Sequence, residues 1–169
     1  MADLPCGTVT FLFTGIEGST KLLNEFRERY AEALAGHRRR LREAFTRQGG
    51  VEVDTQGDAC LYAIRPRPET QSAPAADAQR ALAYGEARTR MGIHDGESIL
   101  TEEGCVGLAL HRGARMAAAG HGGQVLVSQA TRELLPEALN GLTFRNLGEH
   151  RLKDLSQPQS LYQPVGEGL

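Results

Sequence analysis

Residues 8–20 have the sequence TVTFLFTGIEGST, and this stretch predicts a strand that turns directly into a helix. Residues 8–13 are β-branched, aromatic or leucine, which is the composition of a buried strand. Two glycines interrupt that pattern, and Ser19 or Thr20 then offers a hydroxyl N-cap for the helix. The free N–H groups of such a turn can bind phosphate, but an ordinary strand-to-helix turn has the same composition. It is not a Walker A loop, because no Gly-Lys-Ser/Thr follows.

The residues after this turn predict one long helix that ends at Gly49-Gly50. Its apolar positions recur at spacings of three and four, which gives a single stripe. The stripe consists of Leu23, Phe26, Tyr30, Leu34, His37, Leu41 and Ala44. The helix also carries a basic cluster, Arg38-Arg39-Arg40 with Arg42. We interpret this cluster as a solvated helix face, with a basic interaction patch as the alternative.

Two short segments, 51–53 and 59–64, flank the turn Thr55-Gln56-Gly57-Asp58 and predict a β-hairpin. Carboxylates at a hairpin tip can hold Mg²⁺, which prefers oxygen ligands and often takes only one or two from the protein. Asp and Gly are also the ordinary residues of tight turns. The hairpin alone therefore leaves both interpretations open.

The rest of the chain predicts further alternation of helices and strands. We expect a proline-containing loop over 65–74 and a polar excursion over 100–106 that projects as an arm. The expected helices are 75–87, 108–119 and 129–135, the last capped by Ser128, and the expected strands are 88–97, 124–127, 144–151 and 160–165. The order β-α-β-β-α-β predicts an α/β (α+β) domain with a ferredoxin-like βαββαβ core and C-terminal additions. We expect one domain over residues 1–169, with its core at about 7–165.

Composition excludes several other classes of protein. The net charge is −2, so no global basic field favours nucleic acid or a membrane as partner. Cys6, Cys60 and Cys105 are far apart in sequence, which argues against a disulfide framework or a zinc site. No apolar run approaches the roughly 18 residues of a membrane span, and the N-terminus lacks an export signal. We therefore expect a cytoplasmic protein.

Taken together and in order, the motifs resemble those of class III nucleotidyl (adenylyl/guanylyl) cyclase catalytic domains. VTFLFTGIEGST is similar to the family's opening F-T-D-I-E-G-S-T, and VDTQGDA is similar to its second metal motif. RMGIHDG is similar to its central strand. The matching segments are residues 9–20, 53–59, 90–96, 106–115, 122–128 and 147–155. The resemblance extends from about Gly7 to Pro164, nearly the whole chain.

The resemblance implies an activity and an assembly. Members of this family convert a nucleoside triphosphate, usually ATP, to a 3′,5′-cyclic monophosphate and pyrophosphate. Their domains pair head to tail, and two aspartates of one chain hold two Mg²⁺ or Mn²⁺ ions. The other chain supplies a lysine and an aspartate that bind adenine, with an asparagine and an arginine that act on ribose and the transition state. A homodimer, or a heterodimer with another cyclase domain, is therefore implied, and the excursion over 100–106 lies where the family has a dimerisation arm.

Four positions of this chain depart from the family's pattern. The first metal aspartate falls on Gly15, which has no side chain. The base-reading lysine falls on Asp54 and the base-reading aspartate on Leu108. The transition-state asparagine falls on His111, which can still donate a hydrogen bond from a different geometry. We do not treat Glu17 as a substitute for the missing carboxylate, because it accompanies the aspartate in related sequences.

Other positions keep the family's residues. The second metal aspartate is Asp58, the transition-state arginine is Arg115, and Lys153 matches a lysine that contacts the triphosphate. The expected backbone cradle for phosphate consists of Ile16, Glu17, Gly18, Ser19 and Thr20. We therefore expect a degenerate cyclase homology domain, impaired or inactive as a catalyst, that acts as a dimerising regulatory or nucleotide-binding module. The alternative is a working adenylyl cyclase with an altered site that converts ATP to cyclic AMP.

Overall fold

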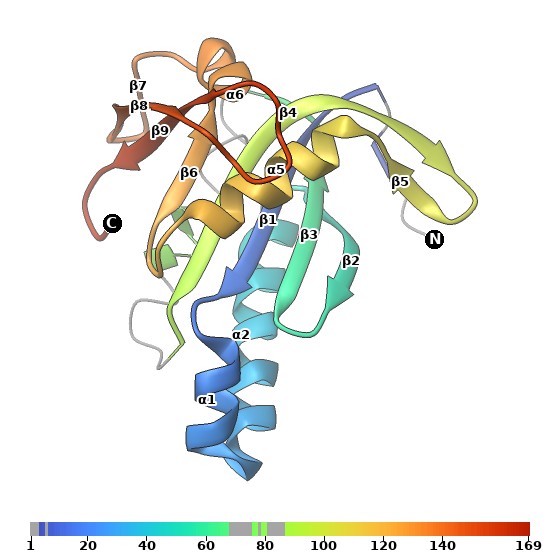
Figure 1. The fold of residues 1–169 in the computed structure, drawn as a ribbon, viewed down its shortest axis with the longest axis vertical. Coiled ribbons are helices and arrows are strands. Elements are labelled where there is room, and N and C mark those ends of the chain that lie inside the picture. The colour runs from blue at the N-terminus through green and yellow to red at the C-terminus, as the bar shows by residue number, and fades with distance from the viewer. Residues whose placement is uncertain (1–3, 6, 68–75, 78, 81–86) are drawn as a thin grey trace.

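The computed structural model describes residues 4–5, 7–67, 76–77, 79–80 and 87–169. Its described strands form one nine-stranded sheet with the order β2-β3-β1-β4-β6-β9-β8-β7, and β5 pairs with β4 (Figure 1). The strands are β1 (Gly7–Ile16), β2 (Val51–Gln56), β3 (Ala59–Ile64), β4 (Thr89–Thr101), β5 (Gly104–Val106), β6 (Val125–Ser128), β7 (Ala138–Leu139), β8 (Leu142–His150) and β9 (Gln159–Val165). The helices are α1 (Ser19–Phe26), α2 (Glu28–Arg47), α5 (Leu108–Ala119) and α6 (Gln129–Leu134).

The ferredoxin-like core is confirmed. β1 lies between β3 and β4 and is antiparallel to both, and β2 pairs with β3 as the predicted hairpin. β6 then joins β4 in parallel, and β9, β8 and β7 extend the sheet as the C-terminal additions. Of the helix predicted over 75–87, the described residues Ala76, Asp77, Gln79 and Arg80 are helical and Ala87 is not. The other positions of that prediction lie outside the described residues, as do Cys6 and most of the predicted loop over 65–74.

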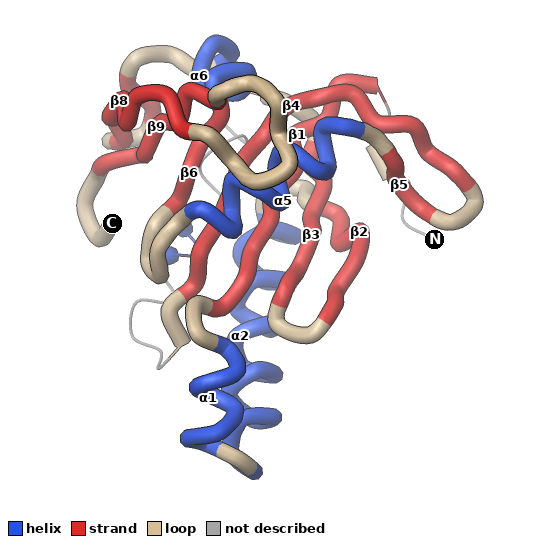
Figure 2. The backbone as a smooth tube through the Cα atoms, in the orientation of Figure 1, coloured by secondary structure: helices blue, strands red, loops and turns tan. Residues whose placement is uncertain are grey.

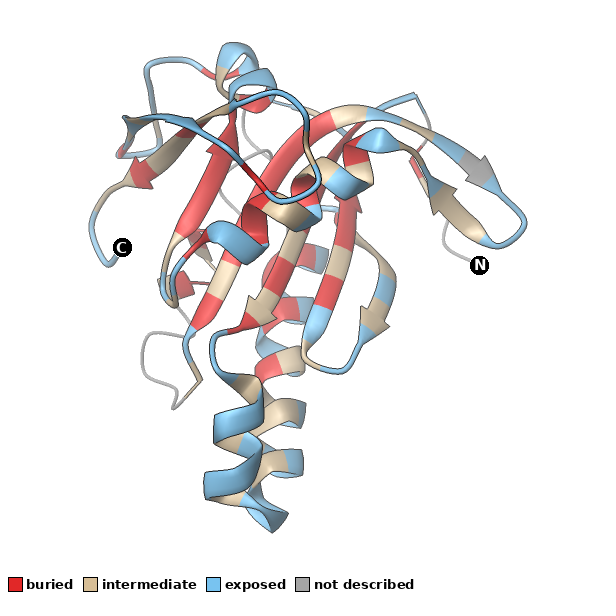
Figure 3. Cartoon of the chain, viewed as in Figure 1, coloured by how far each residue is buried: buried red, intermediate tan, exposed pale blue. Residues whose placement is uncertain are grey.

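Helices cover both faces of the sheet. On one face α2 contributes Leu41 and Phe45, which are fully buried, and the Phe45 ring lies 4.4 Å from the ring of Tyr62. On the other face α5 packs very closely on β1 and β4, since a Cβ placed on Gly113 would lie 2.1 Å from the Phe13 ring. Figure 3 shows the resulting buried band along β1, β4 and β6. The close approach brings α5 directly over the end of β1.

The single long helix predicted after β1 is wrong. Arg27, with a φ of 47°, separates α1 from α2. The predicted N-cap is also wrong: Gly18 takes that position in the left-handed conformation, with no side-chain cap. The turn needs a residue with positive φ at this point, so Ser19 becomes the first helical residue. α1 buries no residue, and the apolar stripe is buried only from His37 onward, because α1 and the start of α2 project beyond the sheet (Figure 3).

Other local predictions are confirmed. α2 ends at Arg47, just before Gly49 with its φ of 81°. α5 has its predicted bounds, and the Ser128 hydroxyl caps α6 by accepting the N–H of Thr131. The excursion over 100–106 is the end of the β4–β5 hairpin, which projects from the sheet (Figure 1). Among the described residues, no helix is long and apolar enough to cross a membrane.

Candidate functional site

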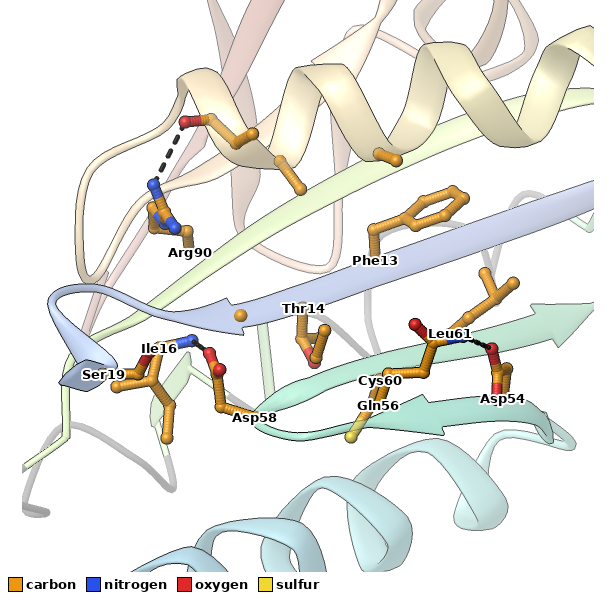
Figure 4. A pocket seen from close by; sticks show the side chains of 15 residues that line it. Phe13, Thr14, Ile16, Ser19, Asp54, Gln56, Asp58, Cys60, Leu61 and Arg90 are labelled. Carbon is orange, nitrogen blue, oxygen red and sulfur yellow. Dashed lines mark hydrogen bonds between the residues drawn. The ribbon is translucent and has the colours of Figure 1, made fainter. Parts of the chain in front are cut away.

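A cleft of about 430 Å³ lies at the C-terminal end of β1, between the β2–β3 hairpin and α5 (Figure 4). Figure 2 shows that the turn after β1 and the turn between β2 and β3 lie at the same end of the sheet. Among the predicted site residues, the cleft is lined by Gly15, Ile16, Ser19, Asp54 and Asp58. The cleft therefore assembles the turn and the hairpin tip, which are about forty residues apart in sequence.

Asp58 is fixed against the turn after β1. Its Oδ2 accepts the backbone N–H of Ile16 at 2.7 Å, and the side chain is half-buried. A Cβ placed on Gly15 would lie 3.8 Å from the same Oδ2, and no other atom of the described residues would lie within 4 Å apart from its chain neighbours. That distance is an ordinary van der Waals contact, and Gly15 does not have a positive φ. A Cβ at position 15 would therefore fit and would contact the carboxylate of Asp58.

The cleft offers one carboxylate for a metal ion where two would be needed for a pair of ions. Asp54 also lines it, but Oδ1 of Asp54 accepts the N–H of Thr55 at 2.8 Å and Oδ2 accepts the side-chain amide of Gln56 at 2.8 Å. Within the described part of the chain, no three His, Cys, Asp or Glu side chains come together as a metal-binding group. Asp58 fits a single Mg²⁺ or Mn²⁺ completed by other oxygen ligands, but the donor set does not fit two ions.

Arg90 is a cleft residue that sequence reasoning missed. It pairs with Gly15 across β1 and β4, and its side chain also lines the cleft. Its Nη1 donates to the carbonyl of Ala118 at 3.1 Å, and among the described residues its buried Nε has no partner. Figure 4 shows Arg90 and Asp58 on either side of the end of β1. No local sequence pattern indicates Arg90 as a site residue, because it is the register of β1 and β4 that brings residues 15 and 90 together.

Two members of the basic cluster of α2 support the hairpin that carries Asp58. Arg38 donates to the carbonyl of Gly57, and Nε of Arg42 donates to Glu52 at 2.7 Å. The hydrogen bond between Arg42 and Glu52 raises the pKa of Arg42 and lowers the pKa of Glu52. Arg39 and Arg40 are exposed, as a solvated helix face predicts.

His37 lies buried on the same helix. Its burial lowers its pKa to about 4, although the negative charge of Asp58 acts in the opposite direction. The imidazole is therefore neutral at pH 7, and its Nδ1 lies 3.5 Å from the Thr89 hydroxyl. His37 is thus a neutral part of the core beneath the cleft.

Part of the predicted phosphate cradle is already hydrogen-bonded inside the chain. The N–H of Ile16 donates to Asp58, and the N–H of Glu17 donates to the carbonyl of Arg88 at 2.8 Å. The first N–H groups of α1, at Ser19 and Thr20, have no acceptor within the helix, as at any helix start. The groups available to an anion are therefore those at the start of α1.

The remaining predicted residues lie outside the cleft. α5 presents Ala114, Ala117 and Ala118 to it. On another side of the helix, Nη2 of Arg115 forms an ion pair with Oδ2 of Asp154 at 2.5 Å. The predicted site residues that do not line the cleft are Glu17, Gly18, Thr20, Leu108, His111, Arg115 and Lys153. His111 and Lys153 are exposed, and Leu108 is 61% exposed at the start of α5. Within one chain, Arg115 and Lys153 therefore do not come together with Asp58 and the other predicted residues that line the cleft.

Comparisons with known proteins support the fold. No protein-family model matches the chain. An uncharacterized protein of Mycobacterium tuberculosis is 36% identical over 162 residues, which cover 94% of this chain and 56% of the relative. A receptor-type adenylate cyclase of Trypanosoma brucei brucei is 27% identical over 207 residues, covering 94% of this chain and 17% of that protein. A solved Trypanosoma brucei adenylate cyclase structure matches with a TM-score of 0.85 and 26% identity, covering 94% of this chain and 89% of that one. This chain thus spans about half the length of its mycobacterial relative.

Proposed function

Because this chain belongs to the class III nucleotidyl cyclase catalytic-domain family, we propose that it is a degenerate member that binds a nucleoside triphosphate and dimerises but is impaired as a catalyst. The observation that carries the proposal is the pair formed by Gly15 and Asp58. Position 15 faces Asp58 with room for a side chain, yet it supplies no carboxylate. The cleft keeps the place for a second metal ligand but lacks the ligand itself.

The missing carboxylate has a large expected effect on rate. Metal ions in a two-metal displacement stabilise both the attacking and the leaving oxygen, and losing one such contribution costs on the order of several kcal/mol. Since about 1.4 kcal/mol is a tenfold change in rate, we expect a loss of roughly a thousandfold or more. A bound Mg²⁺ or Mn²⁺ would supply charge neutralisation for the triphosphate. Asp58 would hold it, and Arg90 would add a positive charge to the lining of the cleft.

The base-reading positions support the same proposal. Asp54 carries a negative charge at the cleft, where the resemblance implies a lysine, and its carboxylate oxygens are hydrogen-bonded within the hairpin. Leu108 is an apolar, exposed side chain at the other base-reading position. Neither side chain can repeat the hydrogen bonds of the residue it replaces, so selectivity for adenine is expected to be weak.

The separation of the two groups of residues supports dimerisation. The cleft contains Asp58 and Arg90, whereas Arg115 and Lys153 lie elsewhere on the same chain. A triphosphate in the cleft would contact all four side chains only if a second chain supplied the last two. In a homodimer both shared sites would lack the Gly15 carboxylate, and both would contain Asp54, Leu108 and His111.

The test measures binding and turnover on the same sample. We expect a non-hydrolysable ATP analogue with Mn²⁺ to raise the thermal unfolding temperature of the protein, because a ligand that binds only the native state stabilises it. We expect no cyclic nucleotide from ATP or GTP. A matched series restores Gly15→Asp alone and then together with Asp54→Lys, Leu108→Asp and His111→Asn. Activity in the full set, but not in the single variant, is the expected result.

Two results would contradict the proposal in different ways. Metal-dependent cyclic nucleotide formation by the unaltered protein, abolished by Asp58→Ala, would establish the alternative of a working cyclase with an altered site. No stabilisation by millimolar nucleotide would exclude the nucleotide-binding part and leave an interaction module.

A further inference from the structure

Arg115 already has an anionic partner in its own chain. Its Nη2 lies 2.5 Å from Oδ2 of Asp154, which belongs to the segment between β8 and β9. The two side chains are 37% and 61% exposed, so solvent reaches the pair. Arginine binds carboxylate and phosphate oxygens through the same planar set of N–H donors. Asp154 therefore occupies donors that a phosphate would use.

The fold positions Asp154 for this contact. Leu152, two residues earlier, is 7% exposed and packs in a cluster with Met116 of α5, so the segment is held against the helix. The N–H of Leu155 donates to the carbonyl of Leu152 at 3.2 Å, which closes a turn around Asp154. Figure 1 shows this segment crossing α5.

The backbone at Asp154 points to the same conclusion. Asp154 has a φ of 61°, one of three positive values among the described residues other than glycine. Asp and Asn tolerate this left-handed conformation better than most residues. The contact with Arg115 is therefore set by an anchored turn rather than by a freely rotating surface chain.

We propose that Asp154 is an internal competitor for the anion-binding face of Arg115 and so determines how tightly this chain binds triphosphate. The inference rests on the proposed function, because it assumes that Arg115 contacts phosphate. Lys153, next to Asp154, contributes a positive charge at the same turn and stays available. A bound triphosphate would displace the Asp154 carboxylate from Arg115 and would also lie near its negative charge.

The expected size of the effect follows from the exposure of the pair. Exposed ion pairs contribute little to stability, so a competing anion must overcome at most about a fivefold preference. Asp154 therefore weakens binding without preventing it. Because the competition is electrostatic and both side chains are exposed to solvent, the weakening of triphosphate binding by Asp154 should shrink as salt screens the charges.

The experiment titrates the full chain with inorganic triphosphate by calorimetry, at low salt and with EDTA, so that the metal side of the site does not contribute. Asp154→Asn removes the charge and keeps a residue that tolerates positive φ. Glu149→Gln is the matched control, because Glu149 is an exposed carboxylate of β8, close to Asp154 in sequence. We expect Asp154→Asn to bind about threefold to fivefold more tightly than the unaltered chain, and Glu149→Gln to change affinity by less than about twofold. The gain should disappear in the double variant Arg115→Ala with Asp154→Asn and diminish at high salt.

Two results would overturn the inference. Equal affinities for Asp154→Asn and Glu149→Gln would show that only net charge matters. A gain that persists without Arg115 would show that Asp154 acts on another group. These outcomes are separate from failure of the proposed function, which is measured with the nucleotide analogue and Mn²⁺ and depends on Asp58.

Discussion

Gly15→Asp should make the free protein less stable and its metal complex more stable than those of the unaltered chain. The substitution places a second carboxylate near Asp58, since a Cβ at position 15 lies 3.8 Å from Asp58 Oδ2 and, chain neighbours aside, meets no backbone atom of the described residues within 4 Å. Steric strain is therefore small, and charge repulsion dominates. Two like charges repel by about 1 kcal/mol in water and about 4 kcal/mol near a protein surface when they lie about 4 Å apart, and we take that separation as the scale for the two carboxylates. For this open cleft we expect a loss of about 2 kcal/mol.

The assay is thermal unfolding with and without Mn²⁺. A change of 2 kcal/mol in a protein of this size corresponds to roughly 4–8 °C in Tm, so metal-free Gly15→Asp should unfold that much earlier. Mn²⁺ between the two carboxylates removes the repulsion and binds only the native state. At a concentration about 100 times its dissociation constant it adds about 2.7 kcal/mol, which should more than restore the loss.

Gly15→Asn is the control, because it has almost the same shape without the charge. It should show neither the loss in EDTA nor the additional gain in Mn²⁺. If Gly15→Asp and Gly15→Asn unfold at the same temperature under both conditions, position 15 does not face Asp58 as described. The interpretation of the cleft as half of a two-metal site would then be wrong.

Two further predictions concern the scaffold beneath the site. Gly113→Ala should destabilise the protein by about 1–3 kcal/mol in urea unfolding, because its Cβ would lie 2.1 Å from the Phe13 ring. Gly36→Ala should be neutral or stabilising by up to about 1 kcal/mol, because among the described residues a Cβ there meets no atom within 4 Å beyond its own helix. Equal effects of the two substitutions would contradict the α5 packing. Burial lowers the pKa of His37 and of His94 to about 4, so the unfolded chain binds more protons than the native one below about pH 6.5. Stability should therefore fall as pH drops from 6.5 towards 4, by up to about 3 kcal/mol for each histidine, and His37→Gln should reduce that slope; an unchanged slope would rule out His37 as a source.

Local signals predicted most of the elements that form the site. The β-branched run before Gly15 is β1, the Ser128 hydroxyl caps α6, and Gly49 follows the end of α2. Each of these depends on neighbouring residues only, so sequence is sufficient. The break at Arg27 is different, because the apolar stripe continues through it and arginine has no intrinsic preference for positive φ.

The contacts that matter for the site are long-range, and sequence could not predict them. Arg90 reaches the cleft through its register with Gly15, and Asp154 reaches Arg115 across 39 positions of sequence. The resemblance to the cyclase family assigned roles to Asp58 and Arg115, but it could not reveal that Arg115 already forms an ion pair with Asp154. Geometry was needed to separate the residues that share the cleft from those that do not.

The distribution of the departures argues against rescue by a partner chain. A heterodimer with an intact cyclase domain would form two shared sites. One would use this chain's cleft, where position 15 supplies no carboxylate beside Asp58. The other would use its α5 side, where Leu108 and His111 stand and where Arg115 is paired with Asp154. If these positions have the roles that we propose, each half is altered by a different residue, so replacing one half would restore neither site.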